Sequence, residues 1–196
     1  MKNNGTRFIS EMGIFIALGL VFDIVAKPLG DAIWPNGGSI SIAMVPIFMM
    51  SFRYGLKGGL FSGFAIGSIQ IIWSGNGVIH WAQAILDYSF AYGIVGIAGL
   101  FAKVIYKNKD NFKAILYVLI SIFLGGILRT LSHIISGVLF WSQELFAEGQ
   151  SLIVIWIGSS VYNIGYMAPS IILCMIVMTI LALKYYHFIE YTKVEF

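Results

Sequence analysis

Ionisable and amide side chains stand at helical spacing inside segments that are otherwise apolar. In RTLSHIISGVLFW, Arg129 and His133 are four residues apart, and Trp141 follows His133 by eight. In WAQAILDYSFAY, Asp87 follows Gln83 by four. Because residues at this interval share one face of a helix, each segment presents its polar groups along a single stripe.

These side chains are suited to binding a ligand. A third apolar segment, SSVYNIGYMAPS, adds Tyr162 and Asn163. A carboxylate, an imidazole, a guanidinium and an amide offer directed hydrogen bonds, and aromatic faces stack on flat rings and attract cations. If the three segments converge, they form a pocket for a small, hydrophilic, aromatic ligand with room for a positive charge.

The same residues also allow structural interpretations. Asp87 and Arg129 on neighbouring segments can neutralise one another, and His133 can be an ordinary packing histidine. Tryptophans near the ends of apolar segments commonly anchor a protein at the membrane interface. Residue types and spacing alone leave these alternatives open.

The sequence lacks the usual signatures of catalysis. It contains no GxxxxGK[ST] phosphate loop, no HExxH zinc motif and no GxSxG nucleophile elbow. His80, His133 and His187 fall in different segments, which argues against a metal site, and the single cysteine, Cys174, excludes an intrachain disulfide. We therefore expect neither an enzyme nor a bound cofactor or metal.

The composition indicates that these segments lie in a lipid bilayer. Hydrophobic residues make up 59% of the 196 residues and charged residues 11%, whereas an ordinary soluble domain is about 25% charged. Spans of about 20 apolar residues recur along the chain, which predicts one all-α membrane domain over residues 1–196. The six expected spans are Phe8–Ala26, Ile40–Phe52, Leu56–Trp73, Trp81–Tyr106, Phe112–Trp141 and Ser151–Tyr186. The second is too short alone, so we expect it to pair with the third as a helical hairpin.

The distribution of Lys and Arg predicts the orientation of the spans. On alternate sides of the six spans, ten basic residues fall on one side and only Lys27 on the other, with Arg129 inside the membrane. Since cytoplasmic loops accumulate Lys and Arg, both termini are expected in the cytoplasm. The net charge of +3 then belongs to this inner rim and requires no nucleic-acid partner.

Small residues recur every four positions in two spans. Gly55, Gly59, Gly63 and Gly67 place one glycine per turn on a helix face, which allows another backbone to approach closely. For these we expect packing within the molecule. From spacing alone, Gly13 and Ala17 in the first span have the same interpretation.

In its motifs, the chain resembles the thiamine-specific substrate-binding subunit, or S component, of energy-coupling factor (ECF) transporters of Gram-positive bacteria. The resemblance covers nearly the whole length and is densest in SEMGIFIALGL, MVPIFMMSFRYGLKGGLFSGFAIG, AQAILDYSFAYGIVGIAGLF and HIISGVLFWSQ. It implies the S-component fold of six transmembrane helices with both termini cytoplasmic. Its pocket would open outward beneath the loop between the first two spans.

The resemblance also implies which residues bind the substrate. Asp87 stands where the family has a pocket glutamate, and Tyr88 preserves the tyrosine after it. His133, Trp141 and Asn163 match the family's pocket histidine, tryptophan and asparagine. The carboxylate would accept hydrogen bonds from the aminopyrimidine while aromatic faces cover the thiazolium cation.

Besides Asp87, two positions depart from the family pattern. Arg129 replaces a lysine, and a pocket tyrosine appears as Gly158, a gap that Trp156 or Tyr162 would fill. Trp34 is the candidate for the loop tryptophan that stacks on the vitamin, although the spacing around it differs.

Partners and location follow from the resemblance as well. Gly13 and Ala17 match a small-residue patch that docks on the transmembrane coupling subunit, or T component, which carries two ABC ATPases. The chain is thus expected in the plasma membrane as a multi-pass protein that captures thiamine outside and hydrolyses no ATP itself. Two alternatives remain: an S component for another small vitamin or thiamine precursor, and a stand-alone secondary carrier or small channel.

Overall fold

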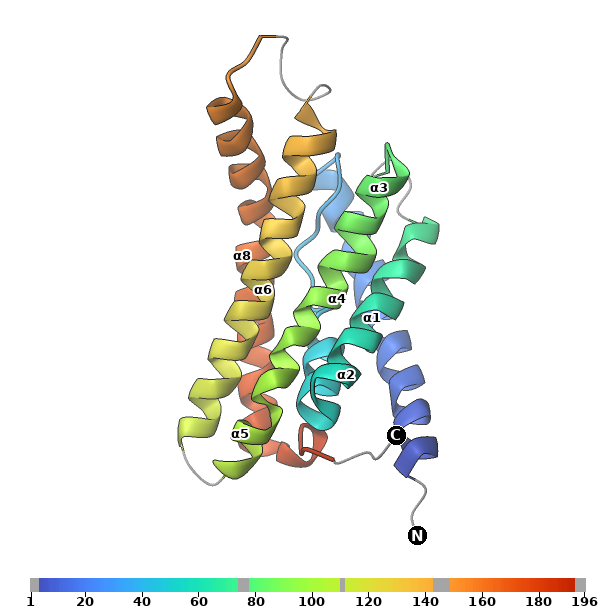
Figure 1. Cartoon of the computed structure of the whole chain (residues 1–196), viewed down its shortest axis with the longest axis vertical. Coiled ribbons are helices and arrows are strands. Elements are labelled where there is room, and N and C mark those ends of the chain that lie inside the picture. The colour runs from blue at the N-terminus through green and yellow to red at the C-terminus, as the bar shows by residue number, and fades with distance from the viewer. Residues whose placement is uncertain (1–3, 74–77, 110–111, 143–148, 193–196) are drawn as a thin grey trace.

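The computed structural model describes residues 4–73, 78–109, 112–142 and 149–192, and its long elements are helices. Five of them are long and apolar enough to cross a membrane. Figure 1 shows these helices running roughly along the long axis of the molecule. The prediction of an all-helical membrane protein is confirmed.

Helix α1 (Asn4–Ile33) is longer than the sequence pattern predicts. The sequence pattern ends the first span at Ala26 and assigns residues 27–39 to a loop, in keeping with Pro28 and the glycines after it. The helix instead continues through Pro28, and an i,i+4 pair of Lys27 with Asp31 at 3.1 Å supports its last turns.

Helix α2 (Val45–Gln70) contains the expected hairpin. Gly55 interrupts it with φ 69° and ψ −160°. Residues other than glycine rarely adopt this conformation, because their Cβ atom clashes with the backbone. Before this turn Tyr54 packs with Phe8 of α1, and after it Ile66 reaches Gly19 of the same helix. The chain therefore reverses at Gly55, and both arms lie along α1.

The first arm of the hairpin, residues 45–54, is buried at every position. It is reached through an extended segment that runs down the middle of the bundle after α1 (Figure 1). This arm forms part of the core, and because it continues into the second arm at Gly55, the two arms are counted together as Val45–Trp73, one of the five candidate spans.

The second arm continues through a 3-10 turn, η1 (Ile71–Trp73), and packs against the next span. That span changes helix type along its length. Its elements are α3 (Trp81–Ala84), the π-helix η3 (Ile85–Phe90), α4 (Ala91–Val95), the 3-10 helix η4 (Gly96–Phe101) and α5 (Ala102–Lys107).

Glycines bring these two helices into backbone contact. A side chain added to Gly59 would meet the backbone of Gly96, and one added to Gly63 would collide with the backbone of Tyr92. The predicted packing within the molecule is confirmed for these glycines, whereas Gly55 serves the turn instead. The close fit fixes the position of the π-helix next to α2.

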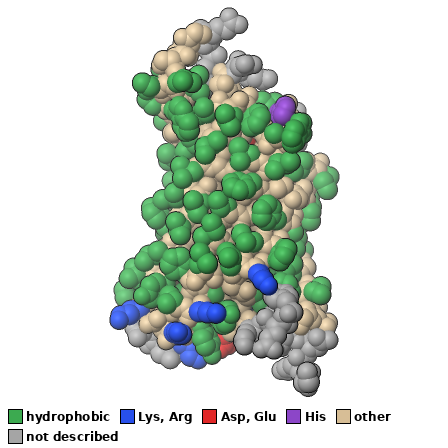
Figure 2. Space-filling model, in the orientation of Figure 1, with side chains coloured by type: hydrophobic (Ala, Val, Ile, Leu, Met, Phe, Trp, Pro, Cys, Tyr) green, Lys and Arg blue, Asp and Glu red, His purple; other side chains and the backbone are tan. Residues whose placement is uncertain are grey.

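Two long helices, α6 (Phe112–Phe140) and α8 (Leu152–Lys184), pack against each other and complete the bundle, and a short 3-10 helix, η5 (Tyr186–Phe188), follows. Hydrophobic side chains cover most of the face in Figure 2, and the visible Lys and Arg side chains gather at the end where α1 begins and α5 ends. This surface suits a protein that spans a bilayer, with its basic residues at one rim.

Candidate ligand-binding site

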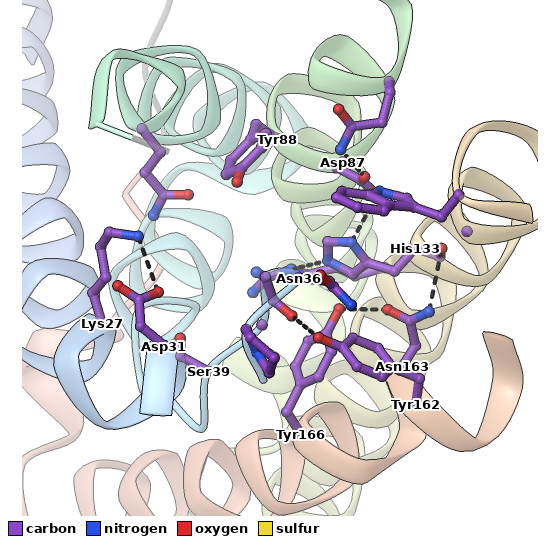
Figure 3. A pocket seen from close by; sticks show the side chains of 18 of the residues that line it. Lys27, Asp31, Asn36, Ser39, Asp87, Tyr88, His133, Tyr162, Asn163 and Tyr166 are labelled. Atoms are coloured by element: carbon purple, nitrogen blue, oxygen red, sulfur yellow. Dashed lines mark hydrogen bonds and ion pairs between the residues drawn. The ribbon is translucent and has the colours of Figure 1, made fainter. Parts of the chain in front are cut away.

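A cavity of about 740 Å³ lies between α1, the segment after it, the C-terminal end of α2, the π-helix, α6 and α8. Its volume falls within the roughly 300 to 1,000 Å³ of small-molecule sites. Figure 3 shows its side chains pointing inward from several helices. The three segments that carry polar residues in the sequence do converge here.

Asp87 comes from the π-helix η3. This helix type is rare in proteins, and where it occurs it is often at a functional site. Its carboxylate accepts hydrogen bonds from Gln83 Nε2 at 2.6 Å and Ser136 Oγ at 2.7 Å. A third contact joins Asp87 Oδ1 to His133 Nδ1 at 3.0 Å. Residues of α3 and α6 thus hold this carboxylate in one orientation.

Arg129 and His133 do not act on Asp87 in the same way. Arg129 Nε donates to His133 Nε2 at 3.3 Å, and the guanidinium carbon lies 3.6 Å from the centre of the Tyr92 ring. Because His133 Nε2 accepts from the arginine, Nδ1 carries the proton that is donated to Asp87. The direct Asp87–Arg129 ion pair left open by the sequence is replaced by a neutral imidazole bridging the two charges.

Helix α8 supplies the next wall. Asn163 Oδ1 accepts from the Tyr166 hydroxyl at 2.6 Å, and Asn163 Nδ2 donates to the Ser159 carbonyl at 2.9 Å. Tyr162 donates its hydroxyl to the Gly37 carbonyl at 2.9 Å. This last bond ties α8 to the segment after α1, which covers part of the cavity.

The structure brings most of the predicted binding residues together. Those that line the cavity are Asp87, Tyr88, Arg129, His133, Trp141, Tyr162 and Asn163. Gly158 lines it as well, and Tyr162 is the neighbouring aromatic residue on the same wall. Seven residues predicted from three separate spans therefore share one cavity.

Trp34 is not among the residues that line the cavity. Because α1 extends to Ile33, Trp34 sits at the helix end, and its ring packs edge-on against Tyr166 with centroids 5.9 Å apart. Residues 35–39, which follow it, line the cavity instead.

The sequence interpretation missed a wall formed by α1 and the end of α2. It contains Asp23, Gln70 and Trp73, with Trp73 Nε1 donating to Asp23 Oδ2 at 3.2 Å and the Tyr92 hydroxyl lying 3.4 Å from Asp23 Oδ1. Asp23 carries the signal that identified Asp87, an acidic residue within an apolar span. Gln70 gives no comparable signal, because an amide at a helix end is common.

The fold and the site together define a class: a polytopic α-helical membrane protein with a polar, aromatic cavity for a small ligand. Residues 9–190 match the family described as thiamine transporter protein (Thia_YuaJ). The chain belongs to this family of transporters and is a multi-pass protein of the plasma membrane.

Relatives and a solved structure agree with this assignment. The chain is 39% identical to the thiamine transporter ThiT of Bacillus subtilis, over 87% of this chain and 88% of the relative. It is 29% identical to ThiT of Lacticaseibacillus paracasei, over 88% and 85%. A structure of ThiT from Listeria monocytogenes, 24% identical, covers 96% of this chain and 100% of its own with a TM-score of 0.80, so the fold is shared.

Proposed function

We propose that this chain is the thiamine-binding S component of an ECF-type importer. It captures thiamine from outside the cell and delivers it by associating with a T component and two ABC ATPases, which hydrolyse the ATP. The observation that carries this proposal is the cavity in which His133 bridges Asp87 and Arg129 beside aromatic side chains. Membership of the thiamine transporter family supports thiamine as the ligand.

The charges around the cavity suit a monovalent cation. Among the residues that the structure describes, its lining contains three carboxylates, Asp23, Asp31 and Asp87, and two cationic groups, Lys27 and Arg129. With His133 neutral, these five groups together carry one net negative charge. The thiazolium ring of thiamine carries one permanent positive charge, which aromatic faces attract as well.

The Asp87 side of the cavity suits the aminopyrimidine ring. A carboxylate accepts hydrogen bonds from an exocyclic amine, and the contacts of Asp87 with Ser136 and His133 orient it for that purpose. Trp141 and Tyr162 offer ring faces for stacking. In this arrangement Arg129 contacts His133 and Tyr92. It orients the imidazole and does not itself bind the ligand.

Gly13 and Ala17 are the proposed docking patch for the T component. Both are exposed on α1, and a side-chain carbon on Gly13 would meet nothing within 4 Å. Small residues four apart allow a partner helix to approach closely.

The proposed topology is one membrane domain with six helices and both termini in the cytoplasm. Counting the two arms of α2 separately at Gly55 gives the sixth helix. The basic residues at the end where α1 begins support a cytoplasmic placement of that end (Figure 2).

Uptake of labelled thiamine into proteoliposomes tests the proposal. We expect ATP-dependent uptake when this chain is reconstituted with its T component and ATPases, and none when it is reconstituted alone. Uptake by the chain alone would establish a secondary carrier or channel, and strong binding of a different vitamin with none of thiamine would change the ligand. Ala17→Trp should abolish uptake and leave thiamine binding intact, whereas Ile172→Trp, at an exposed position of α8, should retain both.

A further inference from the structure

We propose that Asp23 and Gln70 form a second polar subsite, on the α1–α2 side of the cavity, for the cationic ring and hydroxyethyl tail of thiamine. The aminopyrimidine then occupies the Asp87 side. This inference rests on the proposed function and adds ligand contacts that the sequence motifs do not include.

The first observation is the state of the Gln70 amide. Gln70 is only 1% exposed and lines the cavity, yet within the described residues neither its amide nitrogen nor its amide oxygen has a hydrogen-bond partner. The Tyr92 hydroxyl, which lies beside Gln70, donates its proton to Asp23 Oδ1 at 3.4 Å. Buried amides without partners destabilise a protein, so an unpaired amide facing a cavity indicates a group kept for a ligand.

The second observation is the charge of Asp23. Its oxygens are contacted by the neutral donors Trp73 and Tyr92. Lys27, one turn along α1, pairs with Asp31 at 3.1 Å, and in the described part of the chain no cation lies within ion-pair distance of Asp23. A partly buried carboxylate without a cationic partner favours binding of a positively charged ligand.

The third observation is the placement of the two carboxylates on opposite sides of the cavity. Figure 3 shows Lys27 and Asp31 of α1 on one side and His133 and Asn163 on the other. Since Asp23 precedes Lys27 by one helical turn and also lines the cavity, it belongs to the α1 side.

A continuous set of polar contacts connects the two sides. Asp87 contacts His133, Arg129 contacts both His133 and the Tyr92 ring, and Tyr92 contacts Asp23. The two carboxylates are therefore separated by three intervening side chains. This separation suits a ligand of two rings joined by one carbon, with a hydrogen-bond donor at one end and a fixed cation with a hydroxyl at the other.

The hydroxyl and the amide are chemically complementary. The amide oxygen of Gln70 can accept a hydrogen bond from the hydroxyl of the hydroxyethyl group, and its amide nitrogen can donate one to the hydroxyl oxygen. Asp23 supplies the countercharge for the thiazolium ring, which has no N–H group of its own and responds to charge alone.

Binding of three ligands to purified protein tests this inference. The ligands are thiamine, an analogue with ethyl in place of hydroxyethyl, and a neutral isostere whose thiazolium is replaced by thiophene. We expect Gln70→Leu to weaken thiamine binding roughly tenfold and the ethyl analogue by less than about threefold. Asp23→Asn should weaken thiamine binding at least about tenfold and the neutral isostere much less.

Thermal unfolding of the ligand-free variants separates a binding role from a structural one. Because the Gln70 amide has no hydrogen-bond partner among the described residues, Gln70→Leu and Gln70→Met should unfold at or above the wild-type temperature. Ser121→Ala, which removes another buried polar group away from the cavity, serves as the control with unchanged affinity.

Equal losses for all three ligands, or no loss in either Asp23→Asn or Gln70→Leu, would overturn the subsite. If the wild-type chain bound no thiamine, the proposed function would fail together with it. Wild-type binding that the variants leave unchanged would reject the subsite alone.

Discussion

The Nδ1 atom of His133 lies 3.0 Å from Oδ1 of Asp87. On the other side of the same ring, Nε2 accepts from Arg129. The imidazole is therefore oriented from both sides, and it separates the cation from the carboxylate. This leaves Asp87 facing the cavity as an acceptor whose position is fixed before the ligand arrives, which lowers the ordering cost of binding.

Removing the charge of Asp87 should weaken binding. Asp87→Asn keeps the shape of the side chain, but its amide nitrogen would face donors in Gln83 and Ser136. We predict a loss of thiamine affinity of roughly 100-fold, because hydrogen bonds to a charged group contribute about 1.5 to 3 kcal/mol. Titration calorimetry measures this loss. Glu190→Gln, outside the cavity lining, is the control, and an unchanged affinity in Asp87→Asn would contradict the prediction.

The bridge through His133 predicts the order of two coupling energies. In double-mutant cycles on thiamine binding, Asp87 and His133 should couple by about 1 to 2 kcal/mol because they are in contact. Asp87 and Arg129 should couple less, since the imidazole lies between them. The variants Asp87→Asn, His133→Gln and Arg129→Met supply both cycles. A larger coupling for Asp87 with Arg129 would indicate a direct ion pair and contradict this arrangement.

The glycine contact between α2 and α4 predicts opposite effects of one substitution at two sites. Gly63→Ala would drive a methyl group into the Tyr92 backbone, and we predict a loss of roughly 2 to 3 kcal/mol in the free energy of unfolding. Gly13→Ala meets nothing within 4 Å on α1 and should gain up to about 1 kcal/mol from helix propensity. Unfolding in detergent measures both, and equal stability of the two variants would disprove the close approach.

A cluster around Glu11 predicts a large difference between two ion pairs of one carboxylate. Arg53, whose side chain is 6% exposed, binds both oxygens of Glu11 at 2.7 and 2.8 Å. Arg7 binds the same group from a side chain that is 51% exposed. Because Arg53→Met removes three hydrogen bonds of a buried guanidinium, two to Glu11 and one to the His187 carbonyl, and Arg7→Met removes only an exposed pair, Arg53→Met should cost roughly 3 kcal/mol of stability and Arg7→Met below about 0.5. Chemical unfolding compares the two, and similar losses would contradict the difference in burial.

The parts predicted well from sequence depend on local periodicity. Asp87, His133 and Asn163 are polar residues in apolar helices, and membrane burial makes such residues conspicuous. The hairpin also follows from local signals, because a short apolar segment precedes a long one, and Gly55 stands between them.

The parts that could not be predicted depend on tertiary contacts. The helical extension of α1 through Pro28 moved Trp34 onto Tyr166, against the local preference of proline and glycine for a loop. The role of Gln70 requires knowing that the end of α2 faces α1 across a cavity. Asp23 had the right signal, but nothing in its own segment indicates Trp73 and Tyr92 as its donors.

Titration of the purified chain with thiamine, followed by tryptophan fluorescence, tests the central claim most directly. Trp73 and Trp141 both line the cavity, so a stacked ligand should quench their emission. We predict tight, saturable quenching at one thiamine per chain, with the signal reduced and the affinity lowered in Trp141→Ala. The absence of saturable thiamine binding by the wild-type chain would contradict a thiamine site in this cavity. So would a wild-type affinity for thiamine in both Trp141→Ala and Asp87→Asn.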